Sequence, residues 1–423
     1  MNRIAVIGAG YVGLTTAVCF AHIGHDVVCA DIDPERVASL QRGELPIVET
    51  GLGNLLTEGL RSGRLRFVIG AATAAAEAEF VYLCVPTPQA LDGGADLSFI
   101  ETAARQIADV MPAEAIVVNK STVPVGSTKV VERVLGRPDV AVVSNPEFLR
   151  EGSAVHDFLH PDRIVIGSED QGAAIRVASL YLGIPAPLVV TDPASAETIK
   201  YAANAFLATK LSFVNAVAAV CEAVGADVSD VVLGLGYDKR IGHEFLKPGP
   251  GWGGSCFPKD SRALVKIAAD AGYDFDLLKG VISVNEQQQR RVADKIEAAA
   301  GGSVDGVPVA VWGLTFKAGT DDLRDSPSVA ICDQLVARGA KVRAYDPTSP
   351  SGLASIDVAS DPYDACDGAS VLAVLTEWDE FRWVDLARVG QLMARRTIVD
   401  ARNLLDRSAA VRSGFTYNGI GRT

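Results

Sequence analysis

The segment MNRIAVIGAGYVGLTTAVCFAHIGHDVVCADID (Met1–Asp33) decides the fold of this chain. The apolar run Arg3–Ile7 predicts a buried strand, and the turn GAGYVG (8–13) follows it at once and opens an apolar helix. A second strand, predicted over Asp26–Ala30, ends in Asp31, eighteen residues after the last glycine of the turn. Strand, glycine turn, helix and terminal acid together form a complete dinucleotide-binding context.

Each glycine of the turn has a separate purpose. Gly8 permits the tight turn, Gly10 lets a pyrophosphate approach the backbone at the helix N-terminus, and Gly13 lets helix and strand pack closely. The Asp31 carboxylate can accept hydrogen bonds from both ribose hydroxyls, whereas it would repel a 2′-phosphate. We therefore expect NAD rather than NADP; the alternative is a glycine turn that binds nothing.

The first half of the chain continues the same alternation. Apolar runs without polar alternation, typical of strands buried on both faces, follow with helical patterns between them. These further strand candidates are Phe80–Val85, Ala115–Asn119, Val140–Ser144 and Arg163–Gly167. A doubly wound α/β sheet is expected.

The pattern changes near Asp192. An Ala-rich helix without Pro or Gly is predicted over 195–224, and further helix runs to about Ala300. Beyond the Gly301–Gly302 linker, strand candidates at 307–312 and 341–345 flank a predicted helix at 326–338, and two more follow at 370–375 and 397–399. We expect an α/β protein with two Rossmann-like doubly wound domains joined by a long central helix. The expected domains are 1–191, 192–300 and 301–423.

Composition limits the classes of partner. The 423 residues carry a net charge of −13, which argues against nucleic acid and anionic membranes. No apolar run is long enough for a membrane helix, and the N-terminus has no signal-peptide pattern. Seven cysteines without a CxxC pair indicate a reducing, cytoplasmic interior.

The densest glycine cluster contains the most reactive cysteine candidate. In GPGWGGSCFPKD (249–260), glycines allow close approach of a ligand, and Lys259 and the next helix both favour a thiolate at Cys256. Such a thiol can attack a carbonyl, while Asp260 can act as a base or orient a water molecule. The alternative is a small apolar residue in a tight loop.

Other polar residues are candidates for a ligand site, with a surface lysine and plain turns as the alternatives. Lys200 and Asn204 are four apart on the long helix and share a face. The turns at 121–126 and 145–152 follow strands at the carboxyl edge of the sheet. The turn after Trp312 lacks the second and third glycines, so it favours a nucleotide or other phosphate ligand over a second dinucleotide, with a solvated charged loop as the alternative. His156-Asp-Phe-Leu-His160 resembles a zinc motif, but Pro161 ends the helix and no third ligand is evident, so we expect no metal.

Together these motifs resemble the UDP-glucose/GDP-mannose dehydrogenase family over nearly the whole chain. The resemblance rests on GAGYVG, ADIDPERV, STVPVG, NPEFLREG, KYAANAF, GPGWGGSCFPKD, GLTFKAGTDDLRDSP and VDARN. It implies a four-electron oxidation of the 6-hydroxyl of a nucleotide sugar, expected to be UDP-glucose, with two NAD reduced per turnover.

The resemblance also implies roles for single residues. Cys256 would capture the aldehyde as a thiohemiacetal, which a second oxidation converts to a thioester that water cleaves. Lys200 and Asn204 would stabilise the oxyanion, and Asp260 would help activate water. Thr122 and Glu151 would position that water, and Glu147 would belong to the same polar cluster. The first proton acceptor stays open between Lys200 and a water held by Asp260.

The binding residues implied by the resemblance form two sets. The cofactor set comprises Gly8, Gly10, Tyr11, Val12, Gly13, Asp31, Arg36, Pro86, Thr87, Thr122, Glu151, Lys259 and Arg324. The substrate set comprises Glu147, Phe148, Leu149, Lys200, Asn204, Arg240, Gly253, Lys317 and Arg402, with Arg240 acting in a neighbouring subunit. The long helix would form the core of a dimer interface, giving a homodimer or a higher homo-oligomer.

Three alternatives remain open at this point. The first is the same chemistry on GDP-mannose or a UDP-N-acetylhexosamine, since base and sugar specificity depend on a few pocket contacts. A two-electron dehydrogenase would leave Cys256 without a role. A non-catalytic NAD-binding sensor would need neither Cys256, Asp260 nor Lys200.

Overall fold

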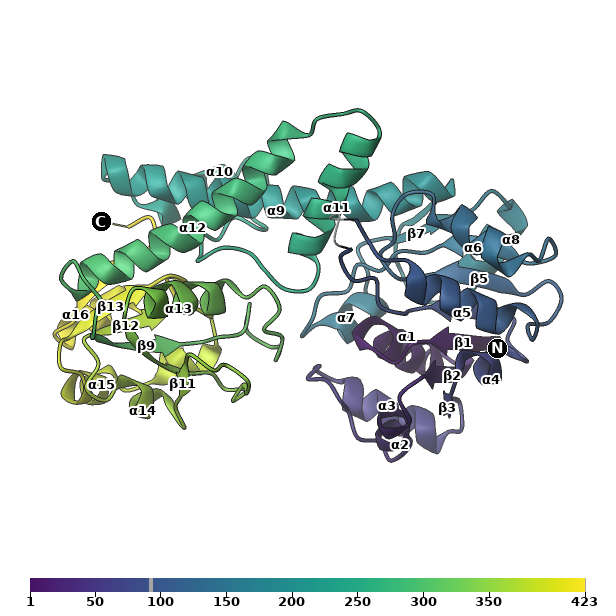
Figure 1. The fold of residues 1–423 in the computed structure, drawn as a ribbon, viewed down its shortest axis with the longest axis horizontal. Coiled ribbons are helices and arrows are strands. Elements are labelled where there is room, and N and C mark those ends of the chain that lie inside the picture. Colours follow the sequence, from purple (N-terminus) through teal and green to yellow (C-terminus); the bar gives the residue numbers. More distant parts are fainter. Residues whose placement is uncertain (91–93, 423) are drawn as a thin grey trace. The chain divides into compact units, whose positions relative to one another are not determined.

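A computed structural model describes residues 1–90 and 94–422. The chain forms two compact units. Unit 1 contains Met1–Ala203 and Arg262–Gly272, and unit 2 contains Asn204–Ser261 and Tyr273–Thr423. Each unit is built on one sheet with helices on both faces (Figure 1).

The sheet of unit 1 has the strand order β3-β2-β1-β4-β5-β6-β7-β8. The strands are β1 Arg3–Ile7, β2 Asp26–Asp31, β3 Leu65–Ile69, β4 Phe80–Leu83, β5 Ile116–Asn119, β6 Ala141–Ser144, β7 Ile164–Gly167 and β8 Leu188–Thr191. All neighbours are parallel except β6 and β7, which pair antiparallel through Ser144 and Gly167. The first six strands have the order of a dinucleotide-binding sheet.

Helices cover both faces of this sheet because alternate residues of its strands point in opposite directions. Ile4 and Val6 pack against one helical layer, and Ala5 and Ile7 pack against the other. The first layer contains α1 Tyr11–His22, α2 Pro34–Gln41, α3 Leu52–Arg61, α7 Ala154–Leu159 and α8 Gln171–Ser179. The second contains α4 Ala71–Ala75, α5 Ser98–Ala108 and α6 Ser127–Leu135.

Unit 2 repeats the topology with one fully parallel sheet in the order β11-β10-β9-β12-β13-β14. Its strands are β9 Pro308–Trp312, β10 Lys341–Tyr345, β11 Asp357–Val358, β12 Val371–Val374, β13 Thr397–Asp400 and β14 Thr416–Gly419. The smaller elements around it are α10 Val228–Gly236, α13 Pro327–Ala337, α14 Pro362–Cys366, η1 Asp379–Trp383, α15 Leu386–Leu392 and α16 Arg407–Arg412. The second Rossmann-like sheet expected from the sequence is confirmed.

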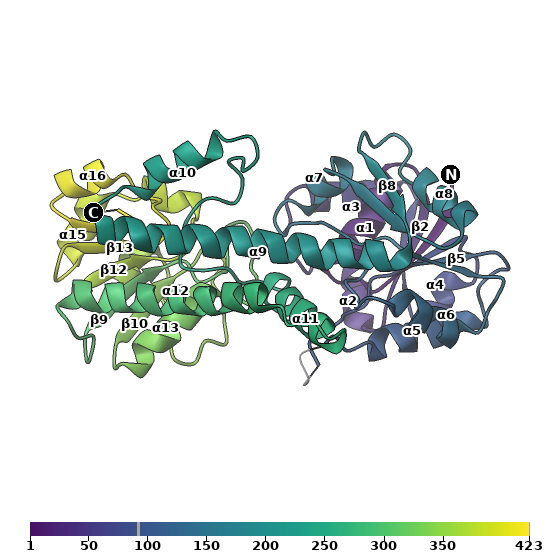
Figure 2. The same cartoon turned by 90° about the horizontal axis from the view of Figure 1, so that it is seen from above.

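Long helices complete the fold. They are α9 Pro193–Val224, α11 Phe257–Asp270 and α12 Asp276–Ala300. Within unit 2, α9 lies along α12 (Figure 2), where Ala218 and Cys221 pack with Val292 and Ile296. The expected long central helix is therefore present, and it begins two residues earlier than predicted.

By length and composition alone, α9 is the one helix of the described residues that could cross a membrane. Its polar side chains nevertheless have partners inside each unit. Glu197 and Lys200 are bound in unit 1, and Ser212 and Asn215 are bound in unit 2. These four polar side chains of α9 are therefore bound to groups within the folded units.

Candidate active site

The glycine turn after β1 has the geometry that a bound pyrophosphate needs. Gly8 has φ +100°, and a Cβ there would lie 2.7 Å from the Cys84 carbonyl oxygen. A Cβ on Gly13 would lie 1.8 Å from the Gly8 carbonyl oxygen, so helix and turn could not pack as they do. A Cβ on Gly10 would meet nothing within 4 Å, so this glycine leaves open space for a ligand at the N-terminus of α1. The turn fits NAD.

Asp31 is held at the end of β2 in the expected place. Its Oδ2 accepts a hydrogen bond from the Ala9 amide at 2.8 Å, and its Oδ1 accepts one from the Asp33 amide at 3.0 Å. The Arg36 guanidinium lies 3.3 Å from the same carboxylate. Asp31 is thereby fixed beside the glycine turn, where a ribose would bind.

Two further turns at the carboxyl edge of the sheet are joined to each other. The Thr87 hydroxyl, after β4, donates to the Thr122 carbonyl oxygen, after β5, at 2.9 Å. Pro86 precedes this link. The turn after β5 is also held by Ser121, whose hydroxyl donates to the Val85 carbonyl oxygen at 2.7 Å. Pro86, Thr87 and Thr122 thus come from one connected edge of unit 1.

The structure brings Glu147 and Lys200 into a buried ion pair. Lys200 Nζ donates to Glu147 Oε1 at 2.8 Å, and both side chains are almost fully buried. The second oxygen, Glu147 Oε2, accepts from the Leu149 amide at 2.6 Å and so shapes the turn through Phe148. Lys200 Nζ lies 5.4 Å from the centre of the Phe148 ring. These residues of the predicted substrate set form one cluster.

The catalytic loop candidate lies in unit 2. Cys256 is partly buried and directly precedes α11, because the Asp260 amide donates to the Cys256 carbonyl oxygen at 2.8 Å as the first bond of the helix. The thiol is therefore placed at the positive end of a helix dipole, which favours its thiolate. Phe257 and Pro258 already belong to the helix, so Cys256 lies directly at its start.

Asp260 is completely buried beside this cysteine. Its Oδ2 accepts from Asn204 Nδ2 at 2.6 Å, and its Oδ1 lies 3.0 Å from Lys259 Nζ. Burying a carboxylate is costly unless polar or charged partners surround it, and Asn204 and Lys259 are such partners. The structure thus joins Asn204, Lys259 and Asp260 in one cluster.

Side-chain amides on α9 and α12, which the sequence did not single out, hold the glycine loop in shape. The Gly249 amide donates to Asn215 Oδ1 at 2.8 Å, and Gln288 Nε2 donates to the Gly249 carbonyl oxygen at 2.8 Å. Asn285 exchanges two hydrogen bonds with the Trp252 backbone, at 2.8 and 2.9 Å. A Cβ on Gly253 would lie 2.0 Å from the Asp325 carbonyl oxygen, so only glycine fits there. The sequence signal that could have identified these residues is a side-chain amide on an otherwise apolar helix face.

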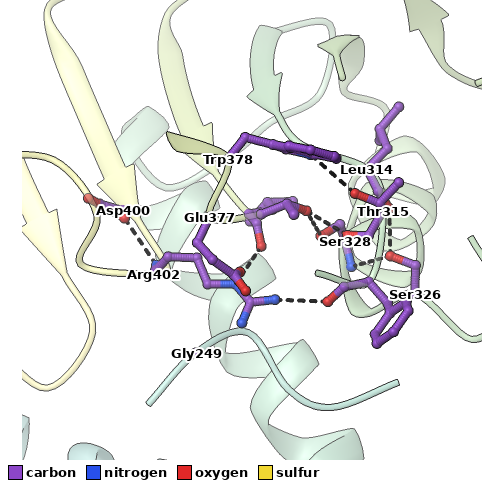
Figure 3. A network of polar contacts seen from close by, with 12 residues as sticks. Gly249, Leu314, Thr315, Ser326, Ser328, Glu377, Trp378, Asp400 and Arg402 are labelled. Carbon is purple, nitrogen blue, oxygen red and sulfur yellow. Dashed lines mark hydrogen bonds and ion pairs between the residues drawn. The ribbon is translucent and has the colours of Figure 1, made fainter. Parts of the chain in front are cut away.

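Arg402 is the centre of a second polar network in unit 2 (Figure 3). Its Nε donates to the Leu375 carbonyl oxygen at 2.9 Å and its Nη2 to the Phe316 carbonyl oxygen at 3.1 Å. Glu377 Oε2 lies 2.9 Å from Nε. Gly249 also lies here, since a Cβ on it would come 3.1 Å from Arg402 Nη1. Arg402 therefore connects the Cys256 loop to the carboxyl edge of the second sheet.

The turn after β9 differs from the cofactor turn in the way its acid is used. Asp346 corresponds to Asp31 but is fully buried, and its Oδ2 accepts from the amides of Leu314 and Thr315 at 2.7 and 3.1 Å. A Cβ on Gly313 would lie 2.3 Å from the Thr376 side chain. This carboxylate is turned into the protein, which supports a ligand other than a second dinucleotide.

Three basic residues of the predicted sets lie nearer the surface of unit 2. Arg240 is exposed and pairs with Asp238 at 2.6 Å, and Arg324 is exposed and pairs with Asp322 at 2.7 Å. Lys317 is partly buried, with Nζ 5.4 Å from the Phe316 ring centre. Their assignment to substrate or cofactor stays a prediction.

The zinc-like motif has a structural role. Asp157 forms an ion pair with Arg150 at 2.5 Å and accepts from the Arg150 amide at 2.8 Å. Among residues 1–90 and 94–422, no group of three or more His, Cys, Asp or Glu side chains is arranged to hold a metal ion.

Comparison with known proteins covers nearly the whole chain. Residues 2–184, 194–287 and 310–407 match the NAD binding, central and UDP binding domains of the UDP-glucose/GDP-mannose dehydrogenase family. The chain is 47% identical to a UDP-glucose 6-dehydrogenase of Rhizobium meliloti, with 99% of each chain covered. It is 44% identical to a UDP-glucose 6-dehydrogenase of Bacillus subtilis, with 100% of this chain and 94% of that protein covered. A solved UDP-glucose dehydrogenase from Pyrobaculum islandicum superimposes with a TM-score of 0.91 at 37% identity, covering 100% of this chain and 98% of that one.

Proposed function

The chain belongs to the UDP-glucose/GDP-mannose dehydrogenase family, and we propose that it oxidises the C6 hydroxyl of UDP-glucose to a carboxylate through a thioester on Cys256. It is an NAD-dependent nucleotide-sugar dehydrogenase. Relatives named for UDP-glucose at 44–47% identity support the choice of sugar. The observation that carries the mechanism is the placement of Cys256 at the N-terminus of α11, one turn before the buried Asp260.

Bound NAD supplies a hydride acceptor for each of the two oxidation steps. The glycine turn, Asp31 and Arg36 would hold the adenosine and pyrophosphate portions. Pro86, Thr87 and Thr122 would line the same edge of the sheet.

The residues of the Cys256 loop would carry the covalent chemistry. The Cys256 thiolate attacks the carbonyl carbon of the aldehyde, and the carbonyl oxygen takes up the charge near Lys200 and Asn204. Removal of the second hydride converts the thiohemiacetal to a thioester. Water then attacks the thioester carbon, Asp260 helps to accept its proton, and the thiolate leaves. Thr122 and Glu151 are assigned to position that water.

The nucleotide end of the substrate is assigned to unit 2. Lys317 and Arg402 are placed at the carboxyl edge of the second sheet, and they can engage a diphosphate or a uridine carbonyl. The Glu147–Leu149 turn and Gly253 are assigned to the sugar end.

We further propose a homodimer in the cytoplasm, with domains at 1–191, 192–300 and 301–423. In α9 the exposed apolar residues Phe206, Phe213, Val220 and Val224 recur at spacings of seven and four, which puts them on one face. Arg240 is assigned to the substrate site of the neighbouring subunit. All seven cysteines are free thiols, in keeping with a reducing compartment.

The stoichiometry of NADH production tests the two-step reaction. The wild-type enzyme should yield two NADH per UDP-glucose. Cys256→Ala should lower formation of the carboxylate by roughly 1,000-fold or more, because the aldehyde can no longer be captured. Cys221→Ala, a buried cysteine of the same unit, is the control and should keep turnover.

Other outcomes identify the alternatives. One NADH per sugar with an active Cys256→Ala variant would establish a two-electron dehydrogenase. Higher kcat/KM with GDP-mannose or a UDP-N-acetylhexosamine would change the substrate. Binding of NAD without turnover on any of these sugars would indicate a sensor.

A further inference from the structure

Three segments of unit 1 that are far apart in the sequence meet at the carboxylate of Glu49. This residue lies in the connection between α2 and α3 and is 8% exposed. Its Oε2 accepts from the Tyr11 hydroxyl and from the Gly152 amide, the latter at 2.8 Å. Its Oε1 accepts from the Ala154 amide at 2.9 Å. A single buried carboxylate thus binds donors from two other segments.

Both of these segments contain residues that are assigned to the cofactor. Tyr11 is the first residue of α1 and follows Gly10, the glycine that leaves space for the pyrophosphate. Gly152 follows Glu151, which is assigned to water and cofactor. The Tyr11 hydroxyl also accepts from the Gly152 amide at 2.8 Å, so the three groups form a closed triangle.

The direction of the hydrogen bonds in the triangle follows from its donors. Burial and the neighbouring Glu49 carboxylate raise the pKa of Tyr11 well above its ordinary value, so its hydroxyl keeps its proton and donates. The two backbone amides can only donate. Both oxygens of Glu49 are therefore required as acceptors, which an amide side chain cannot provide.

We propose that Glu49 is a positioning residue that locks the cofactor turn at Tyr11 to the turn that carries Glu151. Without this carboxylate the two turns would keep only the hydrogen bond from the Gly152 amide to the Tyr11 hydroxyl, and the bond from the Ala154 amide would be lost. Displacements of about 1 Å at a reacting group can cost on the order of 100-fold in rate. The inference rests on NAD as the cofactor, and it holds whichever nucleotide sugar is oxidised.

Calorimetric titration with NAD, in the absence of any sugar, tests the proposal directly. We expect Glu49→Gln and Tyr11→Phe each to raise the Kd for NAD about tenfold, the effect of losing one hydrogen bond to a buried charged group. The double variant should bind NAD more weakly than Glu49→Gln by less than the separate effect of Tyr11→Phe, because both changes act on one connection. Glu44→Gln, an exposed carboxylate five residues away that pairs with Arg42, should leave the Kd unchanged.

Steady-state kinetics separates positioning from a general loss of structure. KM for NAD should rise and kcat should fall, while KM for the nucleotide sugar stays at the wild-type value. Unchanged NAD affinity in the folded variants would overturn the proposal, and so would strictly additive effects, which would show Tyr11 acting on NAD without Glu49. Tyr11→Phe removes one oxygen atom only, so it keeps the test decisive if Glu49→Gln does not fold. If the wild-type protein binds NAD normally but oxidises no nucleotide sugar, that result would count against the proposed reaction alone.

Discussion

The Lys200–Glu147 pair is central at the scale of single residues, because two opposite charges are buried together. Removing one partner of a buried pair leaves an uncompensated charge, which costs roughly 3–5 kcal/mol. Lys200→Ala should therefore lower the melting temperature by several degrees as well as turnover. The loss of stability and the loss of catalysis can be separated in one experiment.

The double variant Glu147→Gln/Lys200→Met makes that separation. It replaces the pair by uncharged groups of similar volume, so most of the stability lost in Lys200→Ala should return. Turnover should stay low, because no cation remains for the oxyanion. Thermal unfolding and kcat measured on the three proteins check this. Recovery of kcat in the double variant would remove Lys200 from the catalytic set.

The sequence identified site residues where the motif that contains them is local. Motifs of glycines and charged residues identified Gly10, Asp31, Cys256 and Asp260 because their chemistry is local. Glu49 escaped, since its partners are 38 to 105 residues away along the chain. Contacts between residues so far apart along the chain produce no recognisable spacing pattern in the sequence.

At the scale of secondary-structure elements, the predictions succeeded for buried apolar strands and failed at the edges. β3 was missed because Arg66 interrupts its apolar pattern. β8 was missed because prolines precede it and it is largely exposed at the end of the sheet. β11 has only two residues, too few for any pattern. Edge strands depend on pairing with a neighbour more than on their own composition.

Helix α9 binds the start of another helix through Glu197, and this contact gives a pH prediction. Glu197 accepts from the Gly126 amide at 2.6 Å and from the Thr128 amide at 3.0 Å, at the N-terminus of α6. Burial raises the pKa of Glu197, although these hydrogen bonds act in the opposite direction. A carboxyl group with a raised pKa binds its proton more tightly in the folded state. Its contribution to stability therefore falls as pH rises from the unfolded pKa through the folded one.

Glu197→Gln should remove this pH dependence. The melting temperature of the variant minus that of the wild type should increase from pH 4 to pH 7, even if the variant is less stable throughout. The exposed Glu286→Gln is the control and should show a constant difference. A difference for Glu197→Gln that is flat, or that falls with pH, would contradict the assignment.

At the scale of the whole molecule, the net charge of −13 appeared unfavourable for an anionic substrate. Besides Arg36, five basic residues of the predicted cofactor and substrate sets form ion pairs with carboxylates in the structure. The pairs are Lys200 with Glu147, Arg240 with Asp238, Lys259 with Asp260, Arg324 with Asp322 and Arg402 with Glu377. These groups therefore act through placed hydrogen bonds more than through a large positive field, because each positive charge has a negative neighbour.

The proposed dimer gives a test at the same scale. Phe213→Asp places a charge in the middle of the exposed apolar face of α9, so it should yield monomers in sedimentation velocity. Val411→Asp changes an equally exposed apolar residue on α16 and should leave the dimer intact. A Phe213→Asp protein that still sediments as a dimer would place the interface elsewhere.

Mixing two inactive variants tests whether Arg240 acts across the dimer. A Cys256→Ala subunit still carries Arg240, and an Arg240→Ala subunit still carries Cys256. If Arg240 acts on the neighbouring subunit's substrate, a heterodimer of the two contains one complete site, and mixing followed by subunit exchange should restore part of the NADH production. The same mixture prepared in the Phe213→Asp background should stay inactive, because its subunits cannot pair. No gain on mixing, despite exchange seen by sedimentation, would confine Arg240 to its own subunit.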